Sequence, residues 1–468
     1  MGAARGATAA AAVAGHRGTA LPGVVAERVW STALPDLARQ LGRVVVVVGT
    51  NGKTTSSRLL ARVIERLDRE PLANRSGANM RQGVVAALVA NADGRGRLRA
   101  RGAPAVFEVD ELALETVLPG LTAPVVLATN LFRDQLDRYG EADAIVDRWA
   151  AALRAAPPGA VLVHCADDPR LTMLAAEVAL PTLTFGLAGP PADRSELTGD
   201  QSTVADPVAC RTCGRPLVYR WRSIGHLGDF ACPDGHVHRP EPTVSVRMRR
   251  PEIGRADEAP PGRTARAPAT LELRGPFGSC SAPAPLRGLP NAYNVAGVIA
   301  AASALGLEGC AALEAMAGTG AAFGRLEELR LDGRRVVLAL VKNAVSLAEM
   351  AALADEIAPD AVLLGLNDAP ADGRDVSWIW DAPLGSLVVG RPVGLTGSRA
   401  TDLRLRLKYD AASGPDITLL DERLEPAFDA MLAATPAAGT LMVVTTYTVL
   451  MHLRAALVRR GHAAPVPR

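Results

Sequence analysis

The sequence has almost no net charge and no long apolar run. Its 51 lysine and arginine residues nearly balance its 49 aspartate and glutamate residues, which leaves a net charge of +2. Because no strongly basic face is implied, nucleic acid is not an expected partner. No run approaches the roughly 20 apolar residues of a membrane span, and the weakly apolar start lacks a signal-peptide core. We therefore expect a cytoplasmic protein, with two or three domains in its 468 residues.

Lysine is scarce. Only three of the 51 basic residues are lysines, Lys53, Lys342 and Lys408. A chain that carries its positive charge as arginine is expected to keep lysine where a compact ammonium is needed. We hypothesise functional roles for all three, with chance retention as the alternative for Lys342 and Lys408.

Five valines, residues 44–48, lead into Gly49-Thr50-Asn51-Gly52-Lys53-Thr54-Thr55. The valines predict a strand buried on both faces, and residues 56–67 predict a helix. Between them, the glycines free backbone N–H groups to face an anion, Lys53 adds a charge and Thr54 a hydroxyl for Mg²⁺. The glycine of a strict Walker pattern is absent at Val47. The stretch still predicts an ATP-binding loop, with a plain glycine turn as the alternative.

Strands and helices alternate along the chain, and polar motifs follow the strands, which predicts an α/β fold with a mostly parallel sheet. We expect a lead-in at 1–42, an ATP-binding domain at 43–328 with an insertion at about 203–243, and a smaller α/β domain at 329–468. In the last domain we expect strands at 335–341, 361–366, 386–389 and 441–445.

Three carboxylates, Glu108, Asp110 and Glu111, lie at the end of a predicted strand. Because like charges repel, a purely structural role is hard to assign, and Glu108 with Thr54 is the expected pair of Mg²⁺ ligands. Asn130 and Asp134, after another strand, are weaker candidates. The alternative for the segment 133–138 is a solvated helix face with ion pairs four residues apart.

Two further segments are candidates for contacts with the nucleotide. Asn291 and Asn294 open a predicted helix after Pro290, where Asn291 suits an N-cap and both amides could face an adenine. Arg325, at the domain junction, could close on phosphates or pair with Glu327.

Cys210, Cys213 and Cys232 lie within 23 residues. The first two form a Cys-x-x-Cys-Gly turn that points two thiolates at one centre, and His236 or His238 could complete a zinc site. Asp234 is a less natural ligand, and the alternative is a degenerate ribbon without metal.

An acidic loop follows the strand 361–366 and holds two of the five tryptophans, Trp378 and Trp380. Acids and aromatics at a sheet end suggest an interface or an active site. The alternative is an acid-rich turn with a buried tryptophan pair. The loop's four acids are Asp368, Asp372, Asp375 and Asp381.

Together these motifs resemble the Mur ligase family. The resemblance rests on the loop 49–55, Glu108-Val109-Asp110-Glu111, Thr129-Asn130, Asn291-x-x-Asn294 and Phe323-Gly324-Arg325-x-Glu327. These ligases activate a carboxylate as an acyl phosphate, which an amine then attacks. The resemblance implies that Lys53, Thr54 and Glu108 serve ATP and Mg²⁺, and that Asn291, Asn294 and Arg325 serve the nucleotide.

The cysteine insertion, the segments 133–140 and 224–230, and Ala371-Asp372-Gly373-Arg374-Asp375 narrow the resemblance to the MurT branch. It runs from about Ala20 to Gly461. The members are ligase-like subunits of lipid II isoglutaminyl synthases. The resemblance implies that Asp375 orients the histidine of a Cys-His pair in a separate, GatD-like glutaminase subunit. This chain shows no Cys-His signature of its own. This chain departs from the pattern of the branch at two points. It lacks a fourth zinc cysteine, and it has Ala344-Val345-Ser346 after Lys342-Asn343, where the branch has Pro-Ala-Gly.

The expected reaction is ATP-dependent amidation of the α-carboxylate of D-glutamate in the lipid II stem, with ammonia from the partner, to give D-isoglutamine. The membrane would be approached only through the lipid-linked substrate. Two alternatives stay open: a Mur-type amino-acid or polyglutamate ligase, and a non-catalytic subunit that only binds partners through its loop and ribbon.

Overall fold

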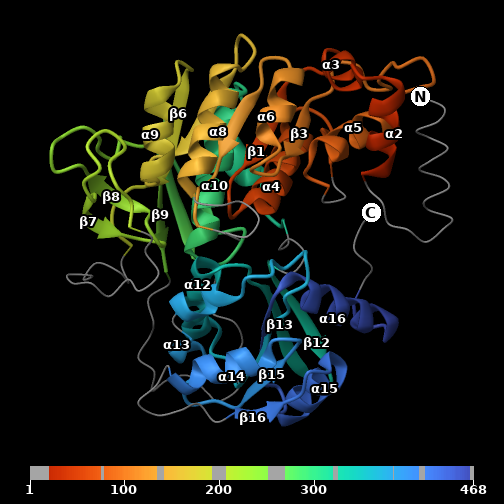
Figure 1. Cartoon of the computed structure of the whole chain (residues 1–468), viewed down its shortest axis with the longest axis vertical. Helices are drawn as coiled ribbons and strands as arrows, with labels where there is room; N and C mark the ends of the chain where they lie inside the picture. Colours follow the sequence, from red (N-terminus) through yellow and green to blue (C-terminus); the bar gives the residue numbers. More distant parts are fainter. Residues whose placement is uncertain are drawn as a thin grey trace.

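The structure is a computed structural model that describes residues 20–74, 78–133, 142–191, 207–250, 269–319, 325–382, 384–409 and 417–463. Figure 1 shows two α/β units, the first in red to green and the second in cyan to blue, each built around its own sheet. This arrangement confirms the predicted fold class. Among the described residues, none of the helices combines the length and apolar character that a bilayer span requires.

The first unit is built on a nine-stranded sheet in the order β11-β10-β9-β6-β5-β4-β1-β3-β2. All neighbours from β2 to β9 pair in parallel, while β10 pairs antiparallel with β9 and β11. The valine run is β1, between β3 and β4 and buried along its whole length, as predicted. The strands are β1 Val44–Val48, β2 Leu72–Ala73, β3 Ala105–Glu108, β4 Val125–Ala128, β5 Val161–Cys165, β6 Thr182–Leu187, β9 Val244–Arg249, β10 Thr270–Gly275 and β11 Gly278–Pro283.

Helices cover this sheet, and α4 packs with α10 and α11. Helix α10 is rich in alanine and mostly buried, because small side chains let it lie close to the sheet. The helices are α2 Leu21–Val29, α3 Ala33–Ala38, α4 Lys53–Leu67, α5 Arg81–Ala90, α6 Leu114–Val117, η1 Leu118–Gly120, α8 Ala142–Arg154, α9 Pro169–Glu177, α10 Leu289–Ala304 and α11 Gly309–Ala315.

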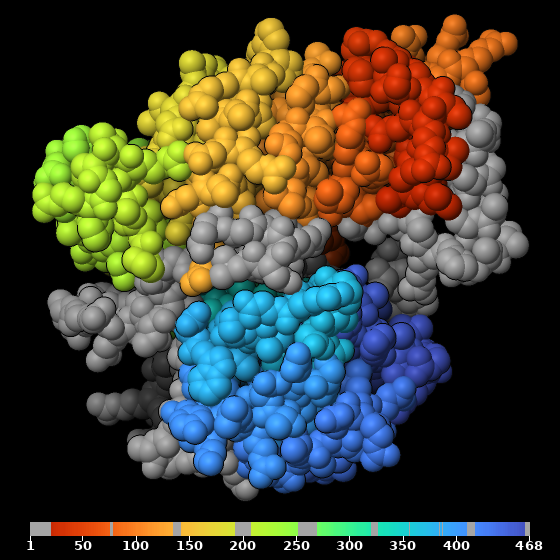
Figure 2. Space-filling model, viewed as in Figure 1, coloured from red at the N-terminus to blue at the C-terminus, as the bar shows by residue number. Residues whose placement is uncertain are grey.

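The insertion between β6 and β9 forms a small knob at the side of the first unit (Figure 2, lime green). Its strands β7 Val218–Arg222 and β8 Gly228–Ala231 form an antiparallel hairpin. A separate apolar cluster, which includes Cys210, Phe230 and Cys232, packs against Met173 of α9. The knob therefore has its own small core and rests on the α9 side of the unit.

The second unit has a six-stranded sheet in the order β12-β13-β17-β14-β15-β16, parallel except for the β12–β13 hairpin. The expected domain boundary at 328/329 falls inside β12. The strand expected at 386–389 is wrong, because that segment contains a helical turn, α13. The elements are β12 Arg325–Leu331, β13 Arg334–Leu340, α12 Ala344–Ile357, β14 Ala361–Gly365, η3 Ser377–Asp381, α13 Gly385–Val388, β15 Val393–Thr396, α14 Ala400–Tyr409, β16 Ile417–Leu420, α15 Leu424–Ala434, β17 Thr440–Thr445 and α16 Tyr447–Arg459.

Candidate active site

The loop between β1 and α4 can be formed only with glycine at two positions. Gly49 and Gly52 have φ angles of 138° and 87°, a region that other residues rarely adopt. A Cβ on Gly49 would lie 2.1 Å from Thr129 Oγ1, and one on Gly52 would lie 2.2 Å from Asn294 Oδ1. The loop is thus wedged between the end of β4 and helix α10, with its backbone at the N-terminus of α4, a suitable place for an anion.

Side chains that follow β4 hold the loop in place. The N–H of Asn51 donates to Asn130 Oδ1 at 2.8 Å, and the Asn51 carbonyl accepts from Asn130 Nδ2 at 3.0 Å and from Thr129 Oγ1 at 2.7 Å. Thr50 Oγ1 accepts from the N–H of Phe132 at 3.0 Å. Asn130 therefore braces the loop, a role that its position after a strand did not reveal. Asp134, the other weak candidate, lies outside the described residues.

Lys53 is buried at the first position of α4. Its Nζ donates to the Gly49 carbonyl at 2.5 Å and to Glu111 Oε1 at 2.9 Å. Burial alone would lower the pKa of Lys53, but the charge and hydrogen bond of Glu111 outweigh it and raise the pKa above its ordinary value. Glu111 Oε2 is buried without a hydrogen-bond partner among the described residues. Lys53 therefore stays charged beside the loop.

The three acids at the end of β3 and just after it, Glu108, Asp110 and Glu111, have different surroundings. Glu108 Oε1 accepts from Thr54 Oγ1 at 3.1 Å, so the two expected Mg²⁺ ligands lie together. Asp110 Oδ1 accepts the N–H of Leu112 at 3.1 Å and closes a turn. Asn74 holds the Glu108 backbone through hydrogen bonds of 2.9 and 2.8 Å. A hydroxyl and a carboxylate are hard oxygen donors of the kind Mg²⁺ takes, so this donor set fits Mg²⁺.

Asn291 and Asn294 face the loop from α10. The N-cap of this helix is Gly288, so the capping role expected for Asn291 is wrong. Instead, Asn291 Oδ1 accepts from Asn294 Nδ2 at 3.1 Å, and Asn294 Oδ1 accepts from Ser56 Oγ at 3.4 Å. The two amides thus bridge α10 to α4 and line one cavity with Asn51, Gly52 and Thr55.

The second unit closes this cavity. Lys342, just after β13, lines it together with residues of α12. Asn343 caps α12 by accepting the Ser346 N–H at 2.9 Å, and Ser346 Oγ accepts the N–H groups of Asn343 and Lys342 at 3.1 and 3.0 Å. The altered sequence after Lys342 therefore still forms a defined turn. Arg325 begins β12, but its side chain lies outside the described atoms, as do Phe323 and Gly324.

The acidic loop after β14 is pinned by two of its aspartates. Asp368 accepts from Ser398 Oγ and Arg399 Nε, both at 2.9 Å. Asp372 accepts the N–H and hydroxyl of Thr448, at the start of α16, at 2.7 and 2.5 Å. Trp380 is 46% exposed, so a buried tryptophan pair is wrong.

Asp375 lies in this loop and is only partly buried. The hydroxyl and N–H of Ser377 lower the pKa of Asp375, and the charge of Arg133 in the first unit adds to the effect. The N–H bond to Oδ1 measures 2.8 Å. Asp375 does not line the cavity beside the loop 49–55. The proximity of Arg133 to Asp375 could not be predicted from the sequence, since nothing in the pattern joins two residues so far apart.

Cys210, Cys213, Cys232 and His236 gather in the knob, with their ligand atoms all within 4.8 Å of one another. Cys232 Sγ lies 3.6 Å from both Cys213 Sγ and His236 Nδ1. Burial would raise the pKa of Cys232, but the N–H groups of His236 and Asp234 lower it to about 6. Three thiolates and one imidazole fit zinc. His238 is not part of this group.

Each of the two units matches a known protein family. Residues 47–210 match the Mur ligase middle domain, and residues 340–450 match the MurT ligase C-terminal domain. The chain is 29% identical over 412 residues to the lipid II isoglutaminyl synthase (glutamine-hydrolyzing) subunit MurT of Staphylococcus aureus, covering 87% of this chain and 86% of that protein. The corresponding subunit of Streptococcus pneumoniae is 28% identical over 408 residues, with coverage of 86% and 84%.

A solved structure shares the fold. A pseudomurein peptide ligase type C from Methanothermus fervidus aligns with a TM-score of 0.64 at 18% identity, covering 90% of this chain and 79% of that one. At that identity the similarity concerns the fold alone.

Proposed function

This chain belongs to the Mur ligase family and carries a MurT-type C-terminal domain, and on that premise we propose that it is the ATP-dependent synthetase subunit of a lipid II isoglutaminyl synthase. The observation that carries the proposal is a combination in one chain. A complete phosphate loop with Lys53 and the Thr54–Glu108 pair occurs together with the MurT-type loop that presents Asp375.

The first step is the attack of the α-carboxylate of D-glutamate on the γ-phosphate of ATP, which gives an acyl phosphate and releases ADP. The loop N–H groups and the Lys53 ammonium would hold the transferring phosphoryl group, and Thr54 and Glu108 would hold Mg²⁺. When bound, Mg²⁺ neutralises charge on the phosphates. Asn291 and Asn294 would contact the nucleotide in the cavity, and Arg325 is proposed to join them. Ammonia then attacks the acyl carbon, and phosphate leaves.

The relatives are named as subunits of a glutamine-hydrolyzing synthase, which implies a second subunit. We propose that this partner is a glutaminase that supplies the ammonia. Asp375 would orient the histidine of its Cys-His pair, since an ionised aspartate fixes an imidazole tautomer. Because ATP is the co-substrate, we place the reaction in the cytoplasm.

The test uses the purified chain with ATP, lipid II and one of three nitrogen sources: ammonium, glutamine or an amino acid. Mass spectrometry is expected to show replacement of a carboxyl OH by NH₂ with ammonium alone, because the synthetase site is complete in this chain. Product formed only with an amino acid would identify a peptide ligase instead. Nucleotide binding without turnover in every mixture would point to a non-catalytic subunit.

We further propose that the knob binds zinc through Cys210, Cys213, Cys232 and His236. Replacing Cys213 with serine is expected to reduce the metal content from about one zinc ion per chain to nearly none, because a structural site needs all four ligands. Metal analysis of the purified chain measures this. Cys310→Ser, a cysteine change in α11 outside the knob, should keep the metal. A wild-type chain that stays metal-free after purification with zinc would contradict the proposal.

A further inference from the structure

The segment 223–228 of the knob, which runs from the end of β7 to the first residue of β8, reaches into the first unit. Ile224 and Leu227 line the same cavity as the phosphate loop. Between them, His226 is only 1% exposed. None of these residues has a part in the proposed chemistry, yet the segment forms part of the nucleotide-side wall.

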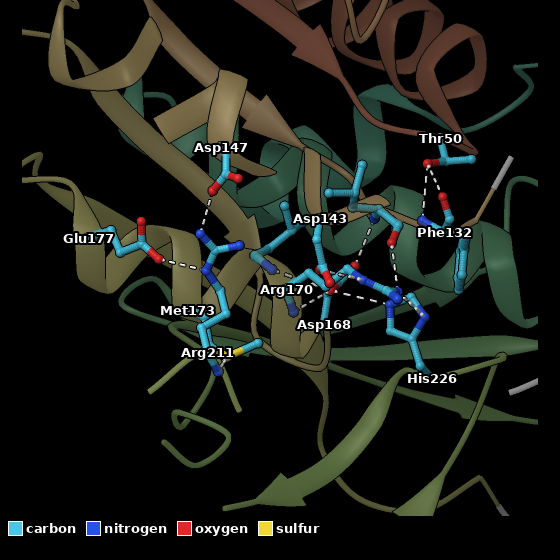
Figure 3. Close-up of polar contacts among 12 residues, drawn as sticks. Thr50, Phe132, Asp143, Asp147, Asp168, Arg170, Met173, Glu177, Arg211 and His226 are labelled. Atoms are coloured by element: carbon cyan, nitrogen blue, oxygen red, sulfur yellow. Dashed lines mark hydrogen bonds and ion pairs between the residues drawn. The ribbon is translucent and has the colours of Figure 1, made fainter. Parts of the chain in front are cut away.

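His226 meets Asp168, a fully buried aspartate that follows β5 (Figure 3). Its Nε2 lies 3.3 Å from Asp168 Oδ1, and Arg170 Nη1 lies 3.2 Å from its Nδ1. A guanidinium can only donate, so Nδ1 accepts and Nε2 carries the proton. Nε2 lies within ion-pair distance of the carboxylate but outside hydrogen-bond geometry. His226 is therefore held in one orientation by two charged side chains.

From Asp168 and His226, contacts lead to the phosphate loop. Asp168 Oδ2 accepts the N–H of Leu131 at 2.7 Å, and the His226 ring packs on Phe132 with a centroid distance of 4.9 Å. Phe132 is in turn hydrogen-bonded to Thr50 of the loop, as Figure 3 shows. The segment that follows β4 is thus fixed on one side by the phosphate loop and on the other by His226.

A second route leads to α10 through the neighbouring aspartate, Asp167. Its Oδ2 accepts the Tyr293 hydroxyl at 2.5 Å, and its Oδ1 accepts from Arg239 of the knob at 2.8 Å. Ser223 Oγ lies 2.7 Å from the same Tyr293 hydroxyl. Tyr293 lies between Asn291 and Asn294 in sequence, so the knob also holds the turn of α10 that carries these amides.

The far side of the knob is fastened as well. Arg211, between the first two cysteines, bonds to Asp147 of α8 at 2.5 Å and to Glu177 of α9 at 2.8 Å, as seen in Figure 3. Its N–H also lies 3.4 Å from Met173 Sδ. With both sides attached, the segment 223–228 is held against the unit.

We propose that His226 is a positioning residue of the nucleotide site, through which the inserted knob holds the segment 130–132 and the phosphate loop in the geometry that binds ATP. The inference rests on the proposed function, in that the cavity is taken as the ATP site. Asp168 Oδ1 also accepts the N–H groups of Arg170 and Leu171 at 2.9 and 3.3 Å, so it keeps partners without His226. Arg170 Nη1, which lies 3.4 Å from the Leu131 carbonyl, loses one acceptor when His226 is removed. Removing an acceptor from a buried guanidinium is costly, so we expect Arg170 to turn and to disturb its contact with Leu131 in the segment 130–132.

The test compares His226→Phe, which keeps a ring on Phe132 but loses both polar contacts, with His226→Gln, whose amide can still donate to Asp168 and accept from Arg170. Affinity for ADP is measured by competition with a fluorescent ADP analogue, beside thermal melting and zinc content. We expect His226→Phe to bind ADP about tenfold more weakly and His226→Gln to recover most of the loss. In the ammonium reaction, KM for ATP should rise with little change in kcat. His452→Phe, the same change on the exposed side of α16, is the control and should bind normally.

A folded His226→Phe chain with wild-type ADP affinity would overturn the inference while the proposed function stands. A wild-type chain that binds no ADP would overturn both. If His226→Phe does not fold, hydrogen exchange of the wild-type chain decides. ADP should slow exchange at the N–H groups of Leu131 and Gly228, which are bonded to Asp168 and Asp167. Unchanged exchange at both positions would overturn the inference.

Discussion

Replacing Lys53 with methionine is expected to lower the rate of ammonium-dependent amidation by about 10³-fold or more, because the charge that holds the transferring phosphoryl group is lost. The same change should lower the free energy of unfolding by about 3–5 kcal/mol, since it leaves Glu111 as a buried carboxylate without its counter-charge. The side chains of Lys53 and Glu111 are only 9% and 3% exposed and lie 2.9 Å apart. The amidation rate and denaturant unfolding measure the two effects.

A second substitution separates the effect on the amidation rate from the effect on stability. Adding Glu111→Gln to Lys53→Met removes the uncompensated charge, so most of the stability should return while the rate stays low. Lys408→Met is the matched control. Lys408, for which the scarcity of lysine suggested a role, is exposed near the end of α14 and does not line the cavity, so the change should be without effect on ammonium-dependent amidation. If the double variant regained activity, Lys53 would not be acting on the phosphates.

Replacing Asp375 with asparagine is expected to lower glutamine-dependent amidation about 10³–10⁴-fold in the complex with the glutaminase, while ammonium-dependent amidation stays intact. Asparagine can still accept the Ser377 N–H, so the loop should keep its shape, but it cannot stabilise an imidazolium in the partner. The measurement is the ratio of the glutamine-dependent rate to the ammonium-dependent rate on one preparation of the complex.

Asp381→Asn is the control for this change, since Asp381 is an exposed aspartate of the same loop. It should leave both rates unchanged. Equal losses with glutamine and ammonium in Asp375→Asn would place Asp375 in the synthetase reaction or in the fold. No loss with either source would remove it from the mechanism.

Local features of the site could be predicted from the sequence. Five valines give a strand buried on both faces in any parallel sheet, and the glycines that follow need φ angles that few other residues adopt. The approach of Glu108 to Thr54 follows from the same logic, because β1 and β3 are parallel neighbours whose carboxyl ends meet at one edge. These predictions were possible because they concern residues within one strand or on adjacent strands.

The segment 386–389 shows where local patterns mislead. Valines at 388 and 389 suggest a strand, yet Leu384, Leu387 and Val388 are buried while Val389 is 54% exposed. That spacing fits a helical turn of period 3.6, not an alternating strand. The strand of this region is β15, which begins at Val393.

Other parts of the site depend on long-range packing. Glu111 pairs with Lys53 and Arg133 influences Asp375 only because the fold brings distant segments together. The contacts of His226 likewise join the knob to α9 and to the end of β4. Each acid or histidine was visible in the sequence, but its partner was not, because charge and spacing alone do not choose among many possible pairs.

The second unit presents two different groups at the carboxyl ends of its parallel strands. Lys342 follows β13 and lines the cavity beside the loop 49–55, while the Asp375 loop follows β14 and is tied to α16 through Asp372. Both strands pair with β17 in one sheet. Any movement of this unit that widens or narrows the cavity must therefore also move Asp375. The proposed synthetase and glutaminase reactions would then be coupled through one rigid-body movement.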